Sequence, residues 1–248
     1  MMYIVTHKKI NNLIYADGWA KYIKVGPSLV DNFDSITDQF DGGISARNNI
    51  YSELTAIFKI YKSADDPVIG ICHYRRFFYE GSCLGLFDKK IKYKNVARYK
   101  LPWGDVVKKI INGDVDVYLP KKKLLVTKLG IKSIYEHFCF YKKREYFDLF
   151  ISKIKTKDFR MGSTYEAYVK GRYTGSYWNM LICRNSEFKE LFKFVFDILF
   201  DLEKEIEERY GEVEPRLMGY FTESFIPFWF EWSGKKIGYL NVAFLEDV

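Results

Sequence analysis

Two adjacent arginines, Arg75 and Arg76, stand directly after a short apolar run. That run, residues 68–72, has no polar side chain, which is typical of a strand buried on both faces of a sheet. A charge at the end of a buried strand is costly unless it meets a partner, and guanidinium groups pair bidentately with phosphate oxygens. We therefore interpret the pair as a diphosphate-binding group. The alternative is a structural pair that caps a helix or bridges to a carboxylate such as Glu53.

The chain has three histidines, and two of them follow predicted strands. His7 comes after a strand predicted at 3–6, and His73 follows the apolar run. A histidine in such a position can hydrogen-bond a phosphate or act as an acid or base. A purely structural role is an equal alternative for His7 and the favoured interpretation of His137. The spacing of the three does not support a metal site.

Asp114 and Asp116 match the Asp-x-Asp pattern that holds a divalent metal against a nucleotide diphosphate. Oxygen ligands of this kind suit Mg²⁺ or Mn²⁺. The same alternation also describes an ordinary strand start, which would place both carboxylates at the wrong end of the strand for a ligand. We therefore favour an activity that requires no metal, with Mn²⁺ or Mg²⁺ at Asp114 and Asp116 as the alternative.

Several familiar chemistries are excluded because their signatures are missing. The chain has no GxxxxGK[ST], GxGxxG, HExxH or GxSxG motif, which removes P-loop, ordinary dinucleotide-binding, zinc-protease and α/β-hydrolase interpretations. The cysteines, Cys72, Cys83, Cys139 and Cys183, form no CxxC pair. We expect reduced thiols, not a disulfide framework or a zinc site.

Strands and helices alternate along the sequence, which predicts an α/β fold with a largely parallel central sheet flanked by helices. We expect strands at 3–6, 22–27, 68–72, 114–120, 177–183 and 237–240, and helices at 45–61, 131–155, 186–209 and 219–232. In sheets of this kind, ligands bind outside the carboxyl ends of the strands. The residues to inspect are therefore 6–8, 73–76 and those around Asn179.

Length and composition fit one α/β domain over residues 1–248, with 48% hydrophobic residues and a net charge of +7. The charge is uneven: residues 89–160 carry 20 Lys/Arg against 7 Asp/Glu, and residues 197–223 carry 9 acidic against 3 basic residues. A functional basic face and two ordinary solvated surfaces are equal interpretations. No secretion signal or membrane-spanning run is visible, so we expect a cytoplasmic protein.

A set of motifs along the chain is shared with one bacterial family. They are Gly43-Ile44-Ser45-x-x-Asn48, Tyr51-x-Glu53-Leu54-Thr55-Ala56, Gly70-Ile71-x-His73-Tyr74-Arg75-Arg76-Phe77-Phe78, Asp116-Val117-x-Leu119-Pro120, Tyr135-x-His137, Asn179-Met180-x-Ile182 and Arg216-x-x-Gly219-Tyr220-x-x-Glu223. With them the chain resembles the capsular and exopolysaccharide biosynthesis family long catalogued as a domain of unknown function. The resemblance covers nearly the whole chain, and the HYRR-type segment is its most specific part.

The resemblance implies a glycosyltransferase with a GT-A-like fold. Such an enzyme would transfer a hexose of the galactose or galactofuranose series from a UDP-sugar to a polysaccharide or lipid-linked oligosaccharide. In GT-A enzymes an Asp-x-Asp motif ends the strand that here ends in the HYRR-type segment. The arginines would then replace the metal in neutralising the leaving diphosphate.

The candidate site residues follow from the resemblance and from their positions after strands. The expected donor-binding residues are Thr6, His7, Lys8, Asn48, Tyr74, Arg75, Arg76 and Asn179. For catalysis we expect His73 to orient the diphosphate and Glu223 to activate the acceptor hydroxyl. A structural salt bridge is an equal alternative for Glu223.

Two other functions remain open on the sequence. The basic stretch 89–160 and the many tyrosines also fit a non-catalytic module that binds RNA or another anionic polymer, although no nucleic-acid-binding motif supports it. The second is a peripheral membrane scaffold in an assembly complex, which would associate with the membrane without turnover. For the enzyme, too, the same stretch predicts peripheral contact with anionic lipid on the inner face of the cell membrane.

Overall fold

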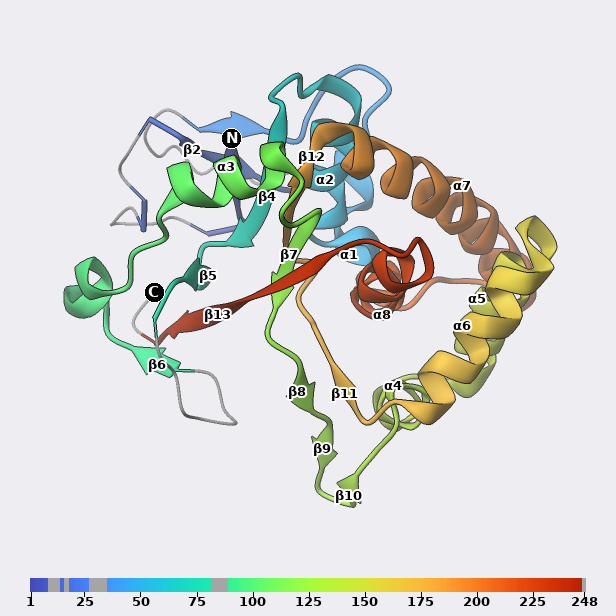
Figure 1. The fold of residues 1–248 in the computed structure, drawn as a ribbon. Coiled ribbons are helices and arrows are strands. Elements are labelled where there is room, and N and C mark those ends of the chain that lie inside the picture. The colour runs from blue at the N-terminus through green and yellow to red at the C-terminus, as the bar shows by residue number, and fades with distance from the viewer. Residues whose placement is uncertain (9–13, 16–17, 27–34, 82–88, 247–248) are drawn as a thin grey trace.

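The computed structural model describes residues 1–8, 14–15, 18–26, 35–81 and 89–246. Pro27 and Cys83, which the sequence placed in a strand and among the reduced thiols, lie outside these ranges. Cys72, Cys139 and Cys183 are free thiols, as expected. The described chain forms a mixed nine-stranded sheet with helices on both faces (Figure 1). No described helix is long and apolar enough to cross a membrane.

The main sheet contains strands from both ends of the chain. Its strands are β1 (Met2–Thr6), β2 (Ala20–Lys24), β3 (Ile36–Thr37), β4 (Val68–His73), β5 (Arg76–Tyr79), β6 (Lys89–Ile91), β7 (Val117–Pro120), β12 (Leu181–Arg184) and β13 (Ile237–Leu245). The order is β12-β7-β13-β5-β4-β1-β2-β3, with β6 beside β13 and a further pairing of β12 with β4. Two small sheets pair β8 (Lys123–Leu124) with β11 (Thr174–Gly175) and β9 (Val126–Thr127) with β10 (Gly130–Ile131).

The helices differ in part from those predicted. They are η1 (Ser45–Arg47), α1 (Asn48–Tyr51), α2 (Leu54–Ser63), η2 (Tyr93–Arg98), α3 (Trp103–Asn112), α4 (Ile134–Tyr141), α5 (Arg144–Lys157), α6 (Phe159–Gly171), α7 (Asn185–Tyr210) and α8 (Leu217–Trp232). The helix predicted at 45–61 is broken at Ser52, which has a positive φ. The helix predicted at 131–155 is two helices, and α6 was not predicted.

Parallel pairing covers only one part of the sheet. Strands β3, β2, β1 and β4 are parallel neighbours, as expected. Beyond β4 the sheet is mixed, because β5 follows β4 after only two residues and so short a connection must reverse the chain. Strand β12 lies antiparallel to both β4 and β7. The expected largely parallel sheet is therefore corrected to a mixed one.

Alternate side chains of the central strands enter two separate hydrophobic clusters. In β1, Tyr3 and Val5 join the cluster that contains the apolar faces of α2, α7 and α8, whereas Met2 and Ile4 join the cluster of α3. Helix α8 is apolar almost all round, and Figure 1 views it close to end-on with α4 to α7 around it. Its Phe221 stacks on Phe150 of α5, with ring centroids 4.7 Å apart. Burial on all sides explains why its sequence shows no polar face.

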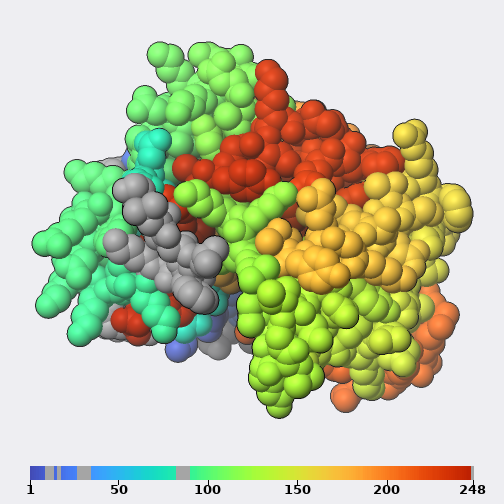
Figure 2. All heavy atoms as spheres, turned by 60° about the horizontal axis from the view of Figure 1, so that its bottom comes forward, coloured from blue at the N-terminus to red at the C-terminus, as the bar shows by residue number. Residues whose placement is uncertain are grey.

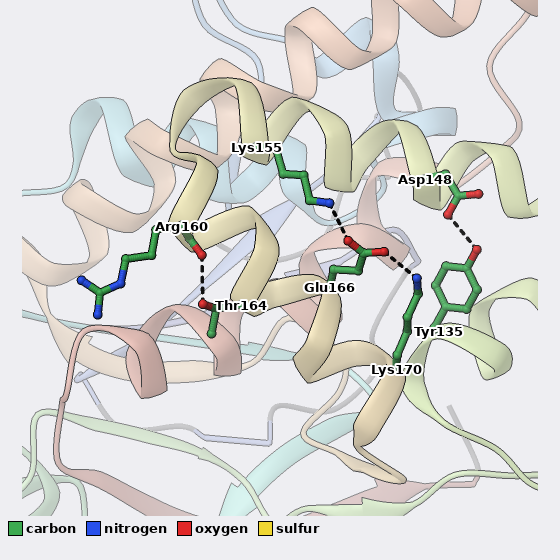
Figure 3. Close-up of polar contacts among 7 residues, drawn as sticks. All are labelled: Tyr135, Asp148, Lys155, Arg160, Thr164, Glu166 and Lys170. Atoms are coloured by element: carbon green, nitrogen blue, oxygen red, sulfur yellow. Dashed lines mark hydrogen bonds and ion pairs between the residues drawn. The ribbon is translucent and has the colours of Figure 1, made fainter.

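The basic and acidic stretches of the sequence partly pair with each other. Lys142 contacts Glu214 at 2.8 Å and Lys153 contacts Glu205 at 2.7 Å. Within the helical part, Glu166 of α6 binds both Lys155 of α5 and Lys170 (Figure 3). Part of the positive charge of 89–160 is therefore neutralised by carboxylates of the helical part.

Candidate functional site

A cavity of about 680 Å³ lies at the carboxyl edge of the parallel strands. Its walls contain residues that end or follow β1, β2 and β4: Val5, His7, Val25 and His73. Strand β12 is antiparallel to β4, so its amino end lies at the same edge and contributes Tyr177 and Trp178. The topology therefore gathers segments from distant parts of the sequence at one edge, where open α/β sheets bind ligands.

Arg75 and Arg76 lie in this cavity, and neither forms an ion pair with a described residue. The reversal from β4 to β5 places them there, and the Nε atoms of both are buried without a hydrogen-bond partner. Their guanidinium groups lie over aromatic rings, Arg75 over Tyr74 at 5.2 Å and Arg76 over Trp178 at 5.4 Å. No carboxylate of the described residues is within ion-pair distance of either arginine. Glu223 and Glu53 act on Arg76 through their charges without an ion pair, so a direct bridge from the pair to Glu53 is not formed.

Arg216 adds a third guanidinium to the same cavity. It precedes α8 in the left-handed conformation, with φ of 63°, and its backbone N–H donates to the carbonyl of Asn49 at 2.8 Å. Its side chain is exposed and, like those of Arg75 and Arg76, forms no ion pair with the described part of the chain. Three cationic groups thus share one cavity, which favours an anionic ligand.

Glu223 of α8 is a half-buried carboxyl group in the cavity wall. Its pKa is raised to about 8: burial and the neighbouring charge of Glu53 raise it, while Arg76, Arg216 and a hydrogen bond with the Trp178 backbone lower it. A carboxyl group with a pKa near neutrality is suited to take or give a proton at physiological pH.

The turn at Trp178 and Asn179 connects these groups. The Trp178 carbonyl is hydrogen-bonded to Nε2 of His73, and the Asn179 amide donates to Oε1 of Glu53 at 2.6 Å. The hydroxyl of Thr222, next to Glu223 on α8, donates to Oδ1 of Asn179 at 2.7 Å. The turn therefore links β4, α8 and the start of α2 into one hydrogen-bonded unit.

Backbone strain is concentrated at this site. The non-glycine residues of the described chain with positive φ are Ser52, Trp178, Asn179 and Arg216. Three of them line the cavity, and the fourth, Asn179, holds Glu53. Such conformations cost about 1–3 kcal/mol each and persist where surrounding structure imposes them, often at functional sites.

Asn48 maintains the break that brings Glu53 into the cavity. Its side-chain amide donates to the Ser52 carbonyl at 2.7 Å and to the Thr55 hydroxyl at 3.1 Å. Glu53 follows Ser52 and directly precedes α2. Asn48 itself also lines the cavity, so it both supports the site and faces its interior.

The cavity brings together most of the residues predicted from the sequence. Those that line it are His7, Asn48, His73, Tyr74, Arg75, Arg76 and Glu223. Thr6 and Lys8 are not among the lining residues: the Thr6 hydroxyl donates to the Lys8 carbonyl at 2.8 Å and so shapes the turn after β1. Asn179 is buried below the wall, where it positions Glu53.

Burial lowers the pKa of all three histidines, including His137, which also lines the cavity. The sequence favoured a structural role for His137. Its ring centroid lies 6.1 Å from that of Tyr177. The position of His137 in the cavity wall fits a structural role and a ligand-binding role equally.

Sequence reasoning did not single out three wall residues: Lys123, Tyr177 and Trp178. Arg216 and Tyr220 entered only as parts of a motif, and Glu53 only in a motif and as a possible partner for the arginines. Tyr177 and Trp178 were placed inside a strand, whereas they form the turn before β12. The Arg216-to-Glu223 spacing was the available signal, because it spans two turns of one helix.

Two acidic residues, Glu53 and Glu223, line the cavity. Glu53 accepts a hydrogen bond from Asn179, and Glu223 favours its protonated form near neutral pH. No cluster of three or more His, Cys, Asp or Glu side chains suited to a metal occurs in the described ranges. Asp116 accepts from the Lys236 backbone N–H at 2.8 Å just before β7, and Asp114 lines a different cavity. The expectation that this pair lies at the amino end of a strand is confirmed.

Comparisons with known proteins agree with the geometry. Residues 1–235 match a family described as a domain of unknown function (DUF4422), and the chain therefore belongs to that family. Among solved structures, the chain is similar to the apo structure of the WbbM bifunctional glycosyltransferase, with a TM-score of 0.79 and 21% sequence identity. The match covers 99% of this chain and 45% of that one, so the chain spans less than half the length of that enzyme. No curated protein sequence matches.

Proposed function

We propose that this member of the DUF4422 family is a glycosyltransferase that uses a UDP-sugar. The donor would carry a hexose of the galactose or galactofuranose series, and the acceptor would be a growing surface polysaccharide or a lipid-linked oligosaccharide. The observation that carries the proposal is the cavity that holds three arginines, none in an ion pair with a described residue, beside a carboxyl group of raised pKa. A fold shared with a glycosyltransferase supports it.

The proposed reaction needs positive charge where the nucleotide leaves. As the acceptor hydroxyl oxygen forms its bond to the anomeric carbon, the bond from that carbon to the β-phosphate oxygen breaks, and the electron pair departs with UDP. Arg75 and Arg76 would stabilise this charge through bidentate contacts. Fixed guanidinium groups are already oriented, so they require no reorganisation during the reaction.

Glu223 would accept the proton of the acceptor hydroxyl. A base with a pKa of about 8 is strong for a carboxylate, and it is effective once ionised. A single displacement of this kind inverts the configuration at the anomeric carbon. His73 is held by the Trp178 carbonyl, which fixes its ring beside the arginines and suits the expected role of orienting the diphosphate.

Aromatic side chains on the Glu223 side of the cavity would bind sugar rings. Tyr177 and Tyr220 line both the main cavity and a small adjoining cleft that also contains Glu223 and His137. Flat aromatic faces pack against the apolar faces of hexoses. We assign this side to the acceptor and the arginine side to the donor.

A non-catalytic module for RNA or another anionic polymer fits less well. Lys142, Lys153 and Lys155 of the basic stretch are bound to carboxylates of the helical part, which reduces the positive charge available to a polyanion there. The unpaired arginines lie inside a cavity of limited volume instead.

A thermal-shift panel tests the proposal. We expect UDP to stabilise the chain more than ADP or GDP does, in EDTA as well as in Mn²⁺. At a hundred times its dissociation constant, UDP should raise the free energy of unfolding by about 2.7 kcal/mol. Arg75→Ala combined with Arg76→Ala removes the shift, whereas Arg98→Ala, an exposed arginine outside the cavity, retains it. Failure of UDP to stabilise the chain, together with salt-dependent binding of RNA, refutes the proposal. A shift that needs Mn²⁺ refutes the metal-free form.

A further inference from the structure

A β-hairpin beside the cavity presents aliphatic side chains to solvent. Strands β9 and β10 form it, and they project away from the main sheet (Figure 1). The exposed fraction is 55% for Val126, 67% for Leu129 and 55% for Ile131. Val126 and Ile131 are directly paired across the two strands, so their side chains share one face.

The hairpin holds these side chains in a defined arrangement. The Thr127 hydroxyl accepts from the Leu129 backbone N–H at 3.1 Å and donates to the Gly130 carbonyl at 3.3 Å. Gly130 has a φ of 96°, which favours glycine at this turn position. These hydrogen bonds close the turn and hold Leu129 at the tip of the hairpin.

The aliphatic face continues to the mouth of the cavity. Leu124, two residues before Val126 on the same side of the chain, is 44% exposed. Leu124, Leu125 and Val126 all line the cavity, and of the three only Leu125 is buried. We call the exposed side chains of Leu124, Val126, Leu129 and Ile131 the aliphatic stripe. In Figure 2 this segment stands at the front of the molecule, between the sheet and the helices.

The stripe is surrounded by positive charge. Residues 121–132 contain five lysines and no acidic residue. Lys122 is bound to Glu231, but Lys128 and Lys132 form no ion pair with the described residues. This differs from α5 and α6, where Glu166 neutralises two lysines. The local charge suits an anionic surface.

We propose that segment 121–132 seats this chain on an anionic lipid bilayer, with the aliphatic stripe in the interfacial region and Lys128 and Lys132 at the headgroups. Aliphatic side chains with flanking lysines favour the interface of an anionic bilayer. A symmetric contact between two copies would bring the Lys128 and Lys132 side chains of both copies together, which is unfavourable. The inference rests on the proposed function in one respect: the bilayer would present a lipid-linked acceptor at the cavity mouth.

Co-sedimentation with vesicles tests the inference without any measurement of activity. We expect the chain to pellet with phosphatidylcholine–phosphatidylglycerol vesicles and much less with phosphatidylcholine alone, and to be released by salt. Leu129→Ser lowers the partition coefficient about tenfold, and Lys128→Ala with Lys132→Ala lowers it by a similar factor. Two control variants should bind as the wild type does: Phe159→Ser, which changes an aromatic side chain 74% exposed on α6, and Lys157→Ala with Lys193→Ala.

Three results overturn the inference. They are equal binding to neutral and anionic vesicles, wild-type binding by Leu129→Ser, and self-association of the wild type that Leu129→Ser abolishes. The nucleotide panel on the same preparation separates the two proposals. A chain that responds to UDP and ignores vesicles loses the membrane contact alone, and a chain that binds vesicles without responding to nucleotides loses the transferase function alone.

Discussion

Replacement of Glu223 by Gln should stabilise the protein and abolish transfer. Burial raises the pKa of this carboxyl group from its usual 4.5 to about 8, so near neutral pH the folded chain retains a proton that the unfolded chain releases. The folded state therefore loses stability as the pH rises from 4.5 towards 8. Gln has nearly the same shape and no charge, so the variant does not lose this stability as the pH rises.

The size of the effect follows from the two pKa values. Each pH unit between them corresponds to about 1.4 kcal/mol, so the difference in unfolding free energy between Glu223→Gln and wild type should grow by about 3 kcal/mol from pH 5 to pH 7.5. For a chain of 248 residues this is a rise of roughly 5–10 °C in the relative Tm. Histidines with lowered pKa values titrate alike in both proteins and cancel in the difference.

Thermal unfolding of both proteins across this pH range measures the effect, with Glu208→Gln on the exposed end of α7 as the matched control. Transfer should fall by about 10²–10⁴, the usual contribution of a general base. A difference in Tm that does not change with pH refutes the account of Glu223 as a group of raised pKa. A Glu223→Gln variant with full activity refutes its role as the base.

Two further predictions concern the neighbours of this group. Arg76→Lys should lower the rate of transfer from a UDP-sugar by about 10²–10³, because an ammonium cannot make the bidentate contact. An initial-rate assay measures this decrease, with Arg98→Lys as the control. An unchanged rate in Arg76→Lys contradicts the prediction. In wild type, kcat/KM should rise with pH towards about 8 as Glu223 ionises. Glu53→Gln should move this rise to lower pH, because it removes a charge that raises the pKa of Glu223. The Gln side chain keeps an oxygen that accepts the hydrogen bond from Asn179. A pH profile of kcat/KM identical to that of the wild type would show that Glu53 does not act on Glu223.

The strand ends were predictable because their signals are local. The continuous apolar run of β4 identified a buried strand, and the rule that ligands bind beyond the carboxyl ends of strands selected His73 and the two arginines. The same reasoning found His7 after β1. It did not find that the chain reverses after Arg75. Strand β5 pairs with β4 and with β13, and β13 comes from the far end of the sequence, so a local pattern does not reveal this pairing.

The amino-acid sequence by itself determined the α/β class, the positions of the main strands and the presence of arginines where an anion could bind. Hydrophobic periodicity and residue type are local properties of the sequence, and they indicate secondary structure without knowledge of the tertiary fold. Only the tertiary structure decided that Glu53, 126 residues before Asn179, is held by that side chain, and that Arg216 and Glu223 line the same cavity as the arginine pair. Burial and proton affinity depend on what surrounds a group, and distant segments supply those surroundings.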